Sequence, residues 1–155
     1  MNRRTVILLL AAALGVTGCA PSEQERAPEP PAGQRRADFR QTLRAKLGTE
    51  YDALLPPATD ESIRHGSRLY DLLCRACHGP TGTGNGRSGR LLAIAPPDLT
   101  DPGNASFFSD RAKLAIIADG IDGTPMIGWS VMLAESERID VLHFMNTLVQ
   151  EPQIP

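Results

Sequence analysis

The chain has 155 residues, a formal net charge of −2 at pH 7, and hydrophobic residues at 41% of its positions. That length predicts one domain with an extension, and the near balance of charge gives no indication of a nucleic-acid partner. Aromatic residues make up only 5% of the chain, so a core of polypeptide alone would be thin and would gain from a large apolar group. The three cysteines are an odd number, so at least one of them needs a role other than an internal disulfide.

Residues 1–18 are predicted to be a signal peptide. The basic start "MNRR" precedes an apolar run over 6–14 that is too short to span a bilayer comfortably. The stretch "VTGC" that ends at Cys19 resembles the lipobox of bacterial lipoproteins, in which the signal is cut before an acylated cysteine. We therefore expect Cys19 to anchor the protein by lipid in the cell envelope, facing the periplasm. An ordinary signal peptide, or an uncleaved anchor with an incidental cysteine, is the alternative.

Residues 19–58 are predicted to form the acylated cysteine and a tether. The segment 21–37 is rich in Pro, Glu, Gln and Arg and has no large apolar residue, which is typical of a flexible spacer. Apolar residues then recur every four positions and predict a short helix over 38–47, which either docks on the domain or binds a partner. As flexible coil, residues 20–58 would span about 30–35 Å.

Residues 59–155 are predicted to form an all-α domain with long loops. Thr59 or Asp60 is suited to cap a first helix, and Ser109 to cap another that ends at Gly120. The stretch "ESERIDVLHFMNTLV" has the apolar spacing of a closing helix. No segment alternates with a period of two, and no internal repeat is visible.

The stretch "CRACHGPTGTG" contains the pattern C-x-x-C-H at Cys74, Cys77 and His78. A thioredoxin-like dithiol belongs at a helix start after a strand, whereas this pair follows a helical pattern with no strands around it. A structural zinc site needs four ligands, and the adjacent Cys and His would make an unusual chelate. The pattern is typical of c-type haem attachment, in which each thiol adds to a vinyl group and the histidine lies beneath the iron. We predict one covalent haem c.

From about residue 59 to 148 the chain resembles a bacterial class I c-type cytochrome. The motifs that carry the resemblance are, in chain order, "GSRLYDLLCRACHG", "GPTGTGNG", "PPDLT", "GIDGTPMIGW" and "IDVLHFMNTL". The resemblance implies the class I cytochrome c fold, a small helical bundle around one haem whose first and last helices cross near Gly66 and Phe144. The family often has tyrosine at the position of Phe144.

His78 is expected to be the proximal iron ligand, and its second ring nitrogen then needs a hydrogen-bond acceptor. The resemblance makes the carbonyl of Pro96 the candidate acceptor. Met126, in the loop "GTPM", matches the distal ligand position of the family, and Met132, which we expect on a helix after Trp129, is its rival. The remaining contenders are less well placed on predicted helices: His65, His143 and Met145.

Other residues have more than one interpretation. Trp129 could donate its indole N–H to a haem propionate or cover the haem edge. Arg75, Arg87 and Arg90 could pair with propionates, form a docking rim or be ordinary surface residues. From Asp60 onward the chain has 12 acidic and 8 basic residues, a net charge of −4, so a strongly basic docking face is not predicted.

Two classes of function agree with these motifs. The first is electron transfer by a membrane-tethered monohaem carrier in a respiratory chain. Such a carrier would shuttle electrons between a dehydrogenase or quinol-oxidising complex and a terminal oxidase or reductase, or would be the haem subunit of such a complex. Its partners would be redox proteins, and it would not itself be an enzyme or act on a small-molecule substrate. The alternative is a gas-binding sensor or peroxidase-like protein with a displaceable sixth ligand.

Overall fold

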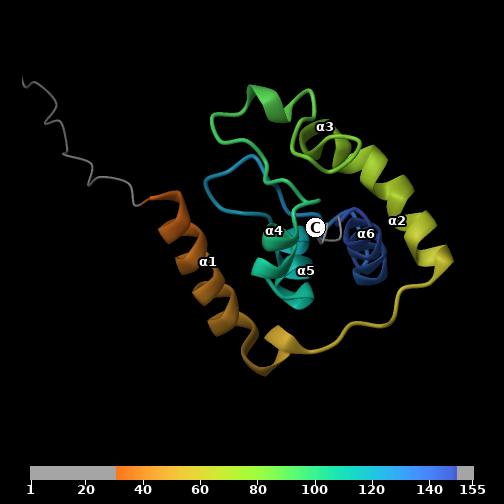
Figure 1. Ribbon diagram of the computed structural model, residues 1–155. Helices are drawn as coiled ribbons and strands as arrows, with labels where there is room; N and C mark the ends of the chain where they lie inside the picture. The colour runs from red at the N-terminus through yellow and green to blue at the C-terminus, as the bar shows by residue number, and fades with distance from the viewer. Residues whose placement is uncertain (1–30, 150–155) are drawn as a thin grey trace, which may run out of the picture. The chain divides into compact units, whose positions relative to one another are not determined.

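The computed structural model describes residues 31–149, so the predicted signal peptide and Cys19 lie outside the described residues. The elements, in chain order, are α1 (Ala32–Leu47), η1 (Gly48–Asp52), α2 (Asp60–Leu73), α3 (Arg75–His78), η2 (Gly89–Leu91), α4 (Pro102–Phe107), α5 (Asp110–Asp119) and α6 (Glu135–Thr147) (Figure 1). Between residues 31 and 149 there is no β-strand, only an isolated antiparallel bridge. The prediction of an all-α domain is confirmed for these residues. None of the described helices has the length and hydropathy needed to cross a membrane.

The helix starts follow the predicted caps. The Oγ1 atom of Thr59 accepts a hydrogen bond from the amide of Ser62 at 3.1 Å, and the Ser62 hydroxyl oxygen accepts one from the Thr59 amide at 3.0 Å. This reciprocal capping box satisfies two amides at the start of α2. At the start of α5 the Ser109 hydroxyl oxygen accepts a single hydrogen bond from the amide of Ala112, and Gly120 ends that helix. Local sequence chemistry therefore determines where these two helices begin.

The contact between α2 and α6 is the most extensive one between two helices of the described chain, and the two lie side by side in Figure 1. A Cβ atom added at Gly66 would lie only 1.9 Å from the carbonyl oxygen of Asp140. One turn further on, the rings of Tyr70 and Phe144 pack with their centroids 5.2 Å apart. The helix crossing implied by the family resemblance is therefore present, and phenylalanine fills the position where tyrosine is common.

Two histidines tie α2 to α6 through polar contacts. His143 is buried, and its Nε2–H donates to the carbonyl of Pro56 at 3.0 Å, while Nδ1 lies 3.0 Å from the hydroxyl of Ser62. His65 pairs through Nδ1 with a carboxylate oxygen of Asp140 at 2.8 Å. Both side chains therefore hold the helix pair together and the start of α2 in place.

The segment before α2 differs from the sequence prediction. The predicted helix over 38–47 is present, but it begins at Ala32, and residues 20–58 are therefore not a continuous flexible coil. Leu43 is buried together with Tyr51 of η1 and Ala112 of α5. Residues 32–37 have no apolar spacing that would predict this early start. Instead the guanidinium of Arg36 stacks over an aromatic ring at 4.1 Å and donates to Asn104 at 2.7 Å.

Replacing Gly66 by alanine tests the helix contact. Because the new methyl group would meet the α6 backbone, which cannot rotate away, we expect Gly66→Ala to lower the free energy of unfolding by about 3 kcal/mol. Denaturant unfolding of the haem-loaded protein measures this change. Gly33→Ala is the matched control, because nothing lies within 4 Å of its added Cβ and alanine favours a helix. Equal stabilities of the two variants would contradict the close contact.

Replacing Leu43 by alanine tests whether α1 belongs to the folded unit. Removal of this buried side chain is expected to weaken the docking of α1 by about 3 kcal/mol. Hydrogen exchange should then show faster exchange of the α1 amides with unchanged protection in α2 and α6. The control is Gln41→Ala at an exposed position of the same helix. Protection of α1 that stays as it was in the Leu43 variant would mean that α1 does not depend on this packing.

Candidate functional site

A single helical turn gathers the three residues of the C-x-x-C-H pattern. α2 ends at Leu73, and the carbonyl of Cys74 accepts hydrogen bonds from the amides of Cys77 at 3.2 Å and His78 at 2.9 Å. Residues three and four positions apart share one face of a helix, so both thiols and the imidazole stand on the same side of α3. Both cysteines are free thiols.

The glycine-rich loop after His78 folds back over this turn. Its amides donate to the carbonyls of the turn: Gly84 to His78 at 2.8 Å, Gly86 to Cys77 at 3.2 Å and Ser88 to Ala76 at 2.9 Å. These are carbonyls that the end of a helix leaves without partners. A Cβ atom at Gly86 or Gly89 would lie 2.4 Å or 2.2 Å from a backbone oxygen of the turn. The small residues therefore allow the loop to lie directly against α3.

Tyr70 holds the start of the same loop through a hydrogen bond. Its side chain is fully buried, and its hydroxyl donates to the carbonyl of Gly79 at 2.9 Å. Burial, followed by the nearby Cys74 and Asp71, raises the pKa of Tyr70, so the hydroxyl keeps its proton and acts as a donor. Sequence reasoning placed Tyr70 only on an apolar helix face. The available signal was that a buried tyrosine hydroxyl usually needs a partner.

His78 has the properties of a proximal iron ligand. Burial lowers its pKa, which favours the neutral imidazole that binds metals. Its Nδ1 atom is buried and has no hydrogen-bond partner among residues 31–149. A buried ring nitrogen without a partner requires an explanation, and a neutral imidazole beside two free thiols fits a covalently held haem.

The predicted acceptor for this histidine lies in the neighbourhood but is not bonded to it. The carbonyl oxygen of Pro96 would lie 2.3 Å from a Cβ at Gly84, which itself donates to the carbonyl of His78. The segment is held there by the amide of Leu99, which donates to the carbonyl of Gly82 at 2.8 Å. The structure thus brings the Pro96 loop against the α3 turn, and the role of Pro96 as acceptor stays a prediction.

The loop that contains Met126 is fastened at its base to the end of α5. The amide of Ile121 donates to the carbonyl of Met126 at 2.9 Å, and Gly120 forms the isolated bridge with Ile127. A Cβ at Gly120 would lie 2.4 Å from the Met126 carbonyl oxygen. The half-buried Met126 side chain therefore projects from a loop with a fixed backbone.

The other contenders for a distal ligand occupy different environments. Met132 is 68% exposed and lies in a turn, not on the helix predicted after Trp129. His65 and His143 are engaged between α2 and α6, and Met145 packs on the core. These positions give no reason to move the prediction away from Met126.

Trp129 and Cys74 border one hydrophobic cluster. Both pack against the buried cluster that α5 and α6 form, which consists of Leu114, Ile117, Val141 and Leu142. The Trp129 amide donates to the carbonyl of Ile117 at 3.0 Å, which fixes the start of the segment. The packing agrees with a covering role for the indole, and its predicted contact with haem remains a prediction.

In the part of the chain that the structure describes, no three His, Cys, Asp or Glu residues are grouped to hold a metal ion, so the four ligands of a structural zinc site are not assembled there.

Comparisons with known proteins agree with this geometry. The family model for cytochrome c matches residues 63–149, more than half of the chain. Among solved structures, the chain is similar to one from the Kuenenia stuttgartiensis reducing HAO-like protein complex Kustc0457/Kustc0458, with 27% sequence identity and a TM-score of 0.53. That alignment covers 67% of this chain and 55% of the other, so the chain spans about half the length of the solved protein. No curated protein sequence matches the chain.

Removal of the Tyr70 hydroxyl tests its support of the loop. Tyr70→Phe leaves the ring in place but deprives the Gly79 carbonyl of its donor, so we expect a loss of about 2 kcal/mol in unfolding free energy. Denaturant titration of the haem-loaded protein measures it. Tyr51→Phe is a matched control, since the Tyr51 hydroxyl is buried without a partner among the described residues and its removal should cost nothing. A loss that is no greater at Tyr70 than at Tyr51 would contradict the role of the bond.

Proposed function

The chain belongs to the cytochrome c family, and on that premise we propose that it is a membrane-tethered monohaem carrier of single electrons in a respiratory chain. The observation that carries this proposal is the α3 turn, which puts two free thiols and a half-buried imidazole on one helix face. The cofactor is covalent haem c, for which Cys74 and Cys77 have the spacing of one attachment site.

When bound, haem c supplies an iron that takes up and gives up one electron. Cys74 and Cys77 would hold it by thioether bonds, with His78 as proximal and Met126 as distal ligand. A His/Met ligand pair raises the reduction potential of haem iron relative to pairs of harder ligands. The protein contributes rigidity, because Tyr70 and the glycine-rich loop fix the turn on one side, while Gly120 fixes the Met126 loop on the other. When the backbone on both sides is held in this way, the positions of the ligand side chains would change little between the two oxidation states of the iron.

The partners of such a carrier would be other redox proteins. The similar solved chain is part of a reducing HAO-like protein complex, which supports either a shuttle between complexes or a haem subunit bound within one. In both cases electrons would pass from a dehydrogenase or quinol-oxidising complex to a terminal oxidase or reductase.

A lipid anchor at Cys19 would keep the carrier at a periplasm-facing membrane surface. Because the folded unit begins at Ala32, only residues 20–31 would separate it from the anchor. As flexible coil, that segment spans about 20 Å. The carrier would therefore stay close to the membrane plane, where membrane-bound donors and acceptors are found.

The test is an absorption spectrum of the dithionite-reduced, haem-loaded protein with and without carbon monoxide. We expect no change for the native chain, because a sixth ligand closes the iron. Met126→Ala should keep haem attached but bind the gas, whereas Met132→Ala should behave as the native chain. The combined Cys74→Ala and Cys77→Ala variant should lose covalent haem on a denaturing gel. A prompt spectral shift of the native protein would favour the gas-binding or peroxidase-like alternative.

A further inference from the structure

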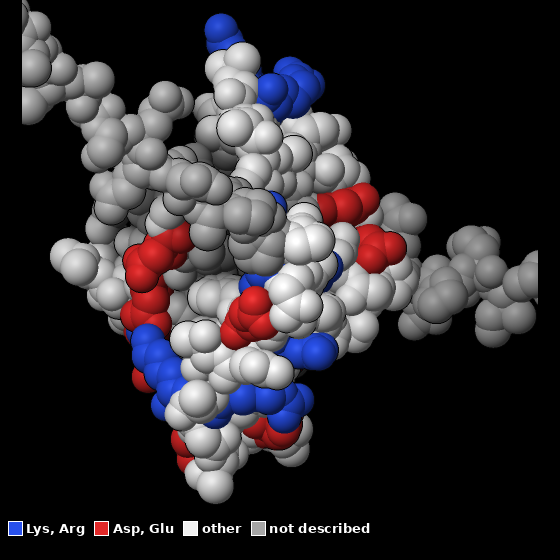
Figure 2. Space-filling view, turned by 90° about the vertical axis from the view of Figure 1, so that its left-hand side faces the viewer, with Lys and Arg blue, Asp and Glu red and all other residues white. Residues whose placement is uncertain are grey.

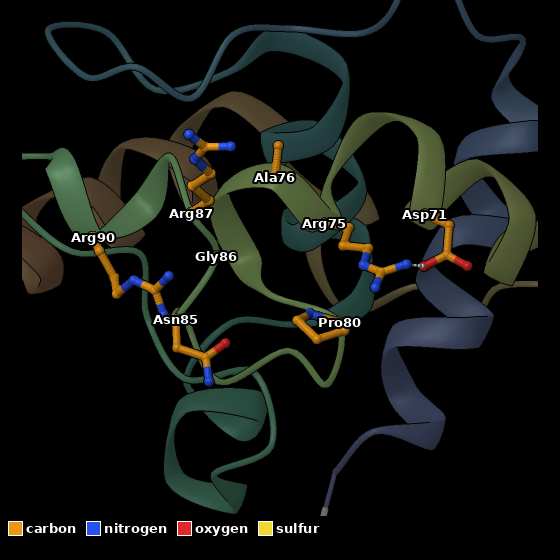
Figure 3. A pocket seen from close by; sticks show the side chains of 8 residues that line it. All are labelled: Asp71, Arg75, Ala76, Pro80, Asn85, Gly86, Arg87 and Arg90. Atoms are coloured by element: carbon orange, nitrogen blue, oxygen red, sulfur yellow. Dashed lines mark ion pairs between the residues drawn. The ribbon is translucent and has the colours of Figure 1, made fainter.

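The arginines around the candidate site differ in what they bind. Arg75, Arg87 and Arg90 line a cavity of about 500 Å³ on the outward side of the haem-attachment turn (Figure 3). Arg75 pairs there with Asp71 at 3.7 Å, and both side chains are more than half exposed, so the pair is weak. Arg36 of α1, in contrast, is half-buried and takes part in a chain of hydrogen bonds that leads toward the candidate proximal ligand.

The basic side chains of α1 are engaged within the folded unit. α1 lies on the left-hand side of Figure 1, which faces the viewer in Figure 2, and both acidic and basic side chains are scattered over that view. Lys46 pairs with Asp119 at 2.7 Å, and the guanidinium of Arg40 stacks over the ring of Phe107 at 4.2 Å. The charges of α1 therefore fasten the helix to the rest of the fold and do not form a surface of a single sign.

Arg36 determines the orientation of the Asn104 side-chain amide. Its Nη1 group donates to Oδ1 of Asn104 at 2.7 Å, and its Nη2 group donates to the Asn104 carbonyl at 3.4 Å. The amide nitrogen of the same side chain donates to the carbonyl of Asp98 at 3.0 Å. Because a guanidinium has only donors, it must face the oxygen of the amide, which turns the nitrogen toward Asp98. Without Arg36 the amide could rotate by half a turn and lose this second bond.

The Asp98 carbonyl belongs to the Pro96 loop, residues 96–100. Within this loop the Asp98 carboxylate accepts hydrogen bonds from the hydroxyl of Thr100 at 2.7 Å and from its amide at 2.8 Å. Both bonds lower the pKa of Asp98, so the carboxylate stays charged and remains an acceptor. On the other side, the amide of Leu99 donates to the carbonyl of Gly82. The loop is thus held between the glycine-rich loop and α4.

The Pro96 loop carries the candidate acceptor for His78. The Nδ1 atom of His78 is buried and has no partner among residues 31–149. The carbonyl of Pro96 lies against Gly84, whose amide donates to the carbonyl of His78. A metal-bound histidine usually donates its second ring N–H to such an acceptor, which makes the imidazole a more basic ligand. The position of the Pro96 loop therefore affects how strongly His78 would bind iron.

We propose that Arg36 is a positioning residue for His78: through Asn104 it holds the Pro96 loop in place to accept the second ring N–H of His78. The inference rests on the proposed function, because it concerns His78 as a ligand of covalent haem. Arg36 precedes residues 63–149, which match the cytochrome c family model. A helix outside the matched part of the chain, close to the predicted lipid anchor, thus contributes to the reduction potential of the carrier.

The test uses the haem-loaded, full-length protein in neutral detergent micelles. Two quantities are measured: the rate at which the Nδ1–H proton of His78 exchanges with solvent, by NMR of the reduced protein, and the midpoint reduction potential. In Arg36→Ala the bond to the acceptor should weaken, and the ring proton should exchange about tenfold faster. A less basic imidazole stabilises ferric iron less, so the potential should also rise.

Arg40→Ala is the matched control for charge and stacking. Arg40 stacks over the same Phe107 ring as Arg36, but within residues 31–149 it makes no hydrogen bond to Asn104. Its removal should leave the exchange of the ring proton unchanged, and the potential should lie below that of Arg36→Ala. Arg36→Lys keeps the charge and one donor, so both quantities should lie between those of the native chain and Arg36→Ala.

A double-mutant cycle separates positioning from a general loosening of the fold. Asn104→Ala removes the amide but leaves Arg36 stacked on its aromatic ring, and it should speed the exchange of the ring proton as much as Arg36→Ala does. The double variant should exchange no faster than either single variant, because both act through one chain of bonds. Additive effects, an unchanged exchange rate in Arg36→Ala, or equal potentials in Arg36→Ala and Arg40→Ala would overturn the proposal.

Failure of the proposed function would be recognised separately. Binding of carbon monoxide by the native protein would show an open distal site and contradict the role of electron carrier. The exchange of the His78 ring proton reports on the proximal side alone, and it can be followed in the carbon monoxide complex as well. The comparison of Arg36→Ala with Arg40→Ala therefore decides the role of Arg36 in either case.

Discussion

The rest of the structure depends on the contact of the α2 backbone at Gly66 with the α6 backbone at Asp140. At this distance no side chain fits between the helices, so the register of one helix against the other is determined. Tyr70, one turn beyond Gly66, then meets Phe144 with its ring and Gly79 with its hydroxyl. The helix crossing is thereby connected to the first residue after the candidate proximal ligand. Tyr70 therefore links the α2–α6 crossing to the loop that follows the haem-attachment turn.

At Gly66 the missing side chain permits contact between two helices, and in the loops around the site other glycines permit contact between backbone segments. At Gly86 and Gly89 a side chain is excluded because the loop lies on carbonyl groups of the α3 turn, and at Gly120 because the chain passes the Met126 carbonyl. In each case the backbone of one segment satisfies the polar backbone groups of another where no regular helix does so. The two predicted iron ligands therefore lie on segments whose backbones are fixed by hydrogen bonds. Such loops give the low reorganisation that an electron carrier needs.

The all-α domain and the attachment turn could be predicted from the sequence because both depend on local patterns, whereas the class I arrangement of the helices was implied by the family resemblance. Helix caps at Thr59 and Ser109, apolar spacing and the C-x-x-C-H pattern are read from residues close in the chain. The start of α1 could not be predicted in this way, since it is stabilised by the packing of Arg36 on residues far along the chain. The hydrogen bond from Tyr70 and the gathering of Arg87 and Arg90 beside Arg75 likewise depend on how the loop folds back. No spacing rule contains that information.

The short α3 helix has two faces with different tasks, and its period connects them. Positions one and two after Cys74 must turn away from the side that carries the thiols and the imidazole. Any exposed residue at those positions is therefore one peptide unit from a haem-bound cysteine. The spacing that would allow two thiols to hold one haem thus also leaves Arg75 and Ala76 exposed on the outward face of the turn.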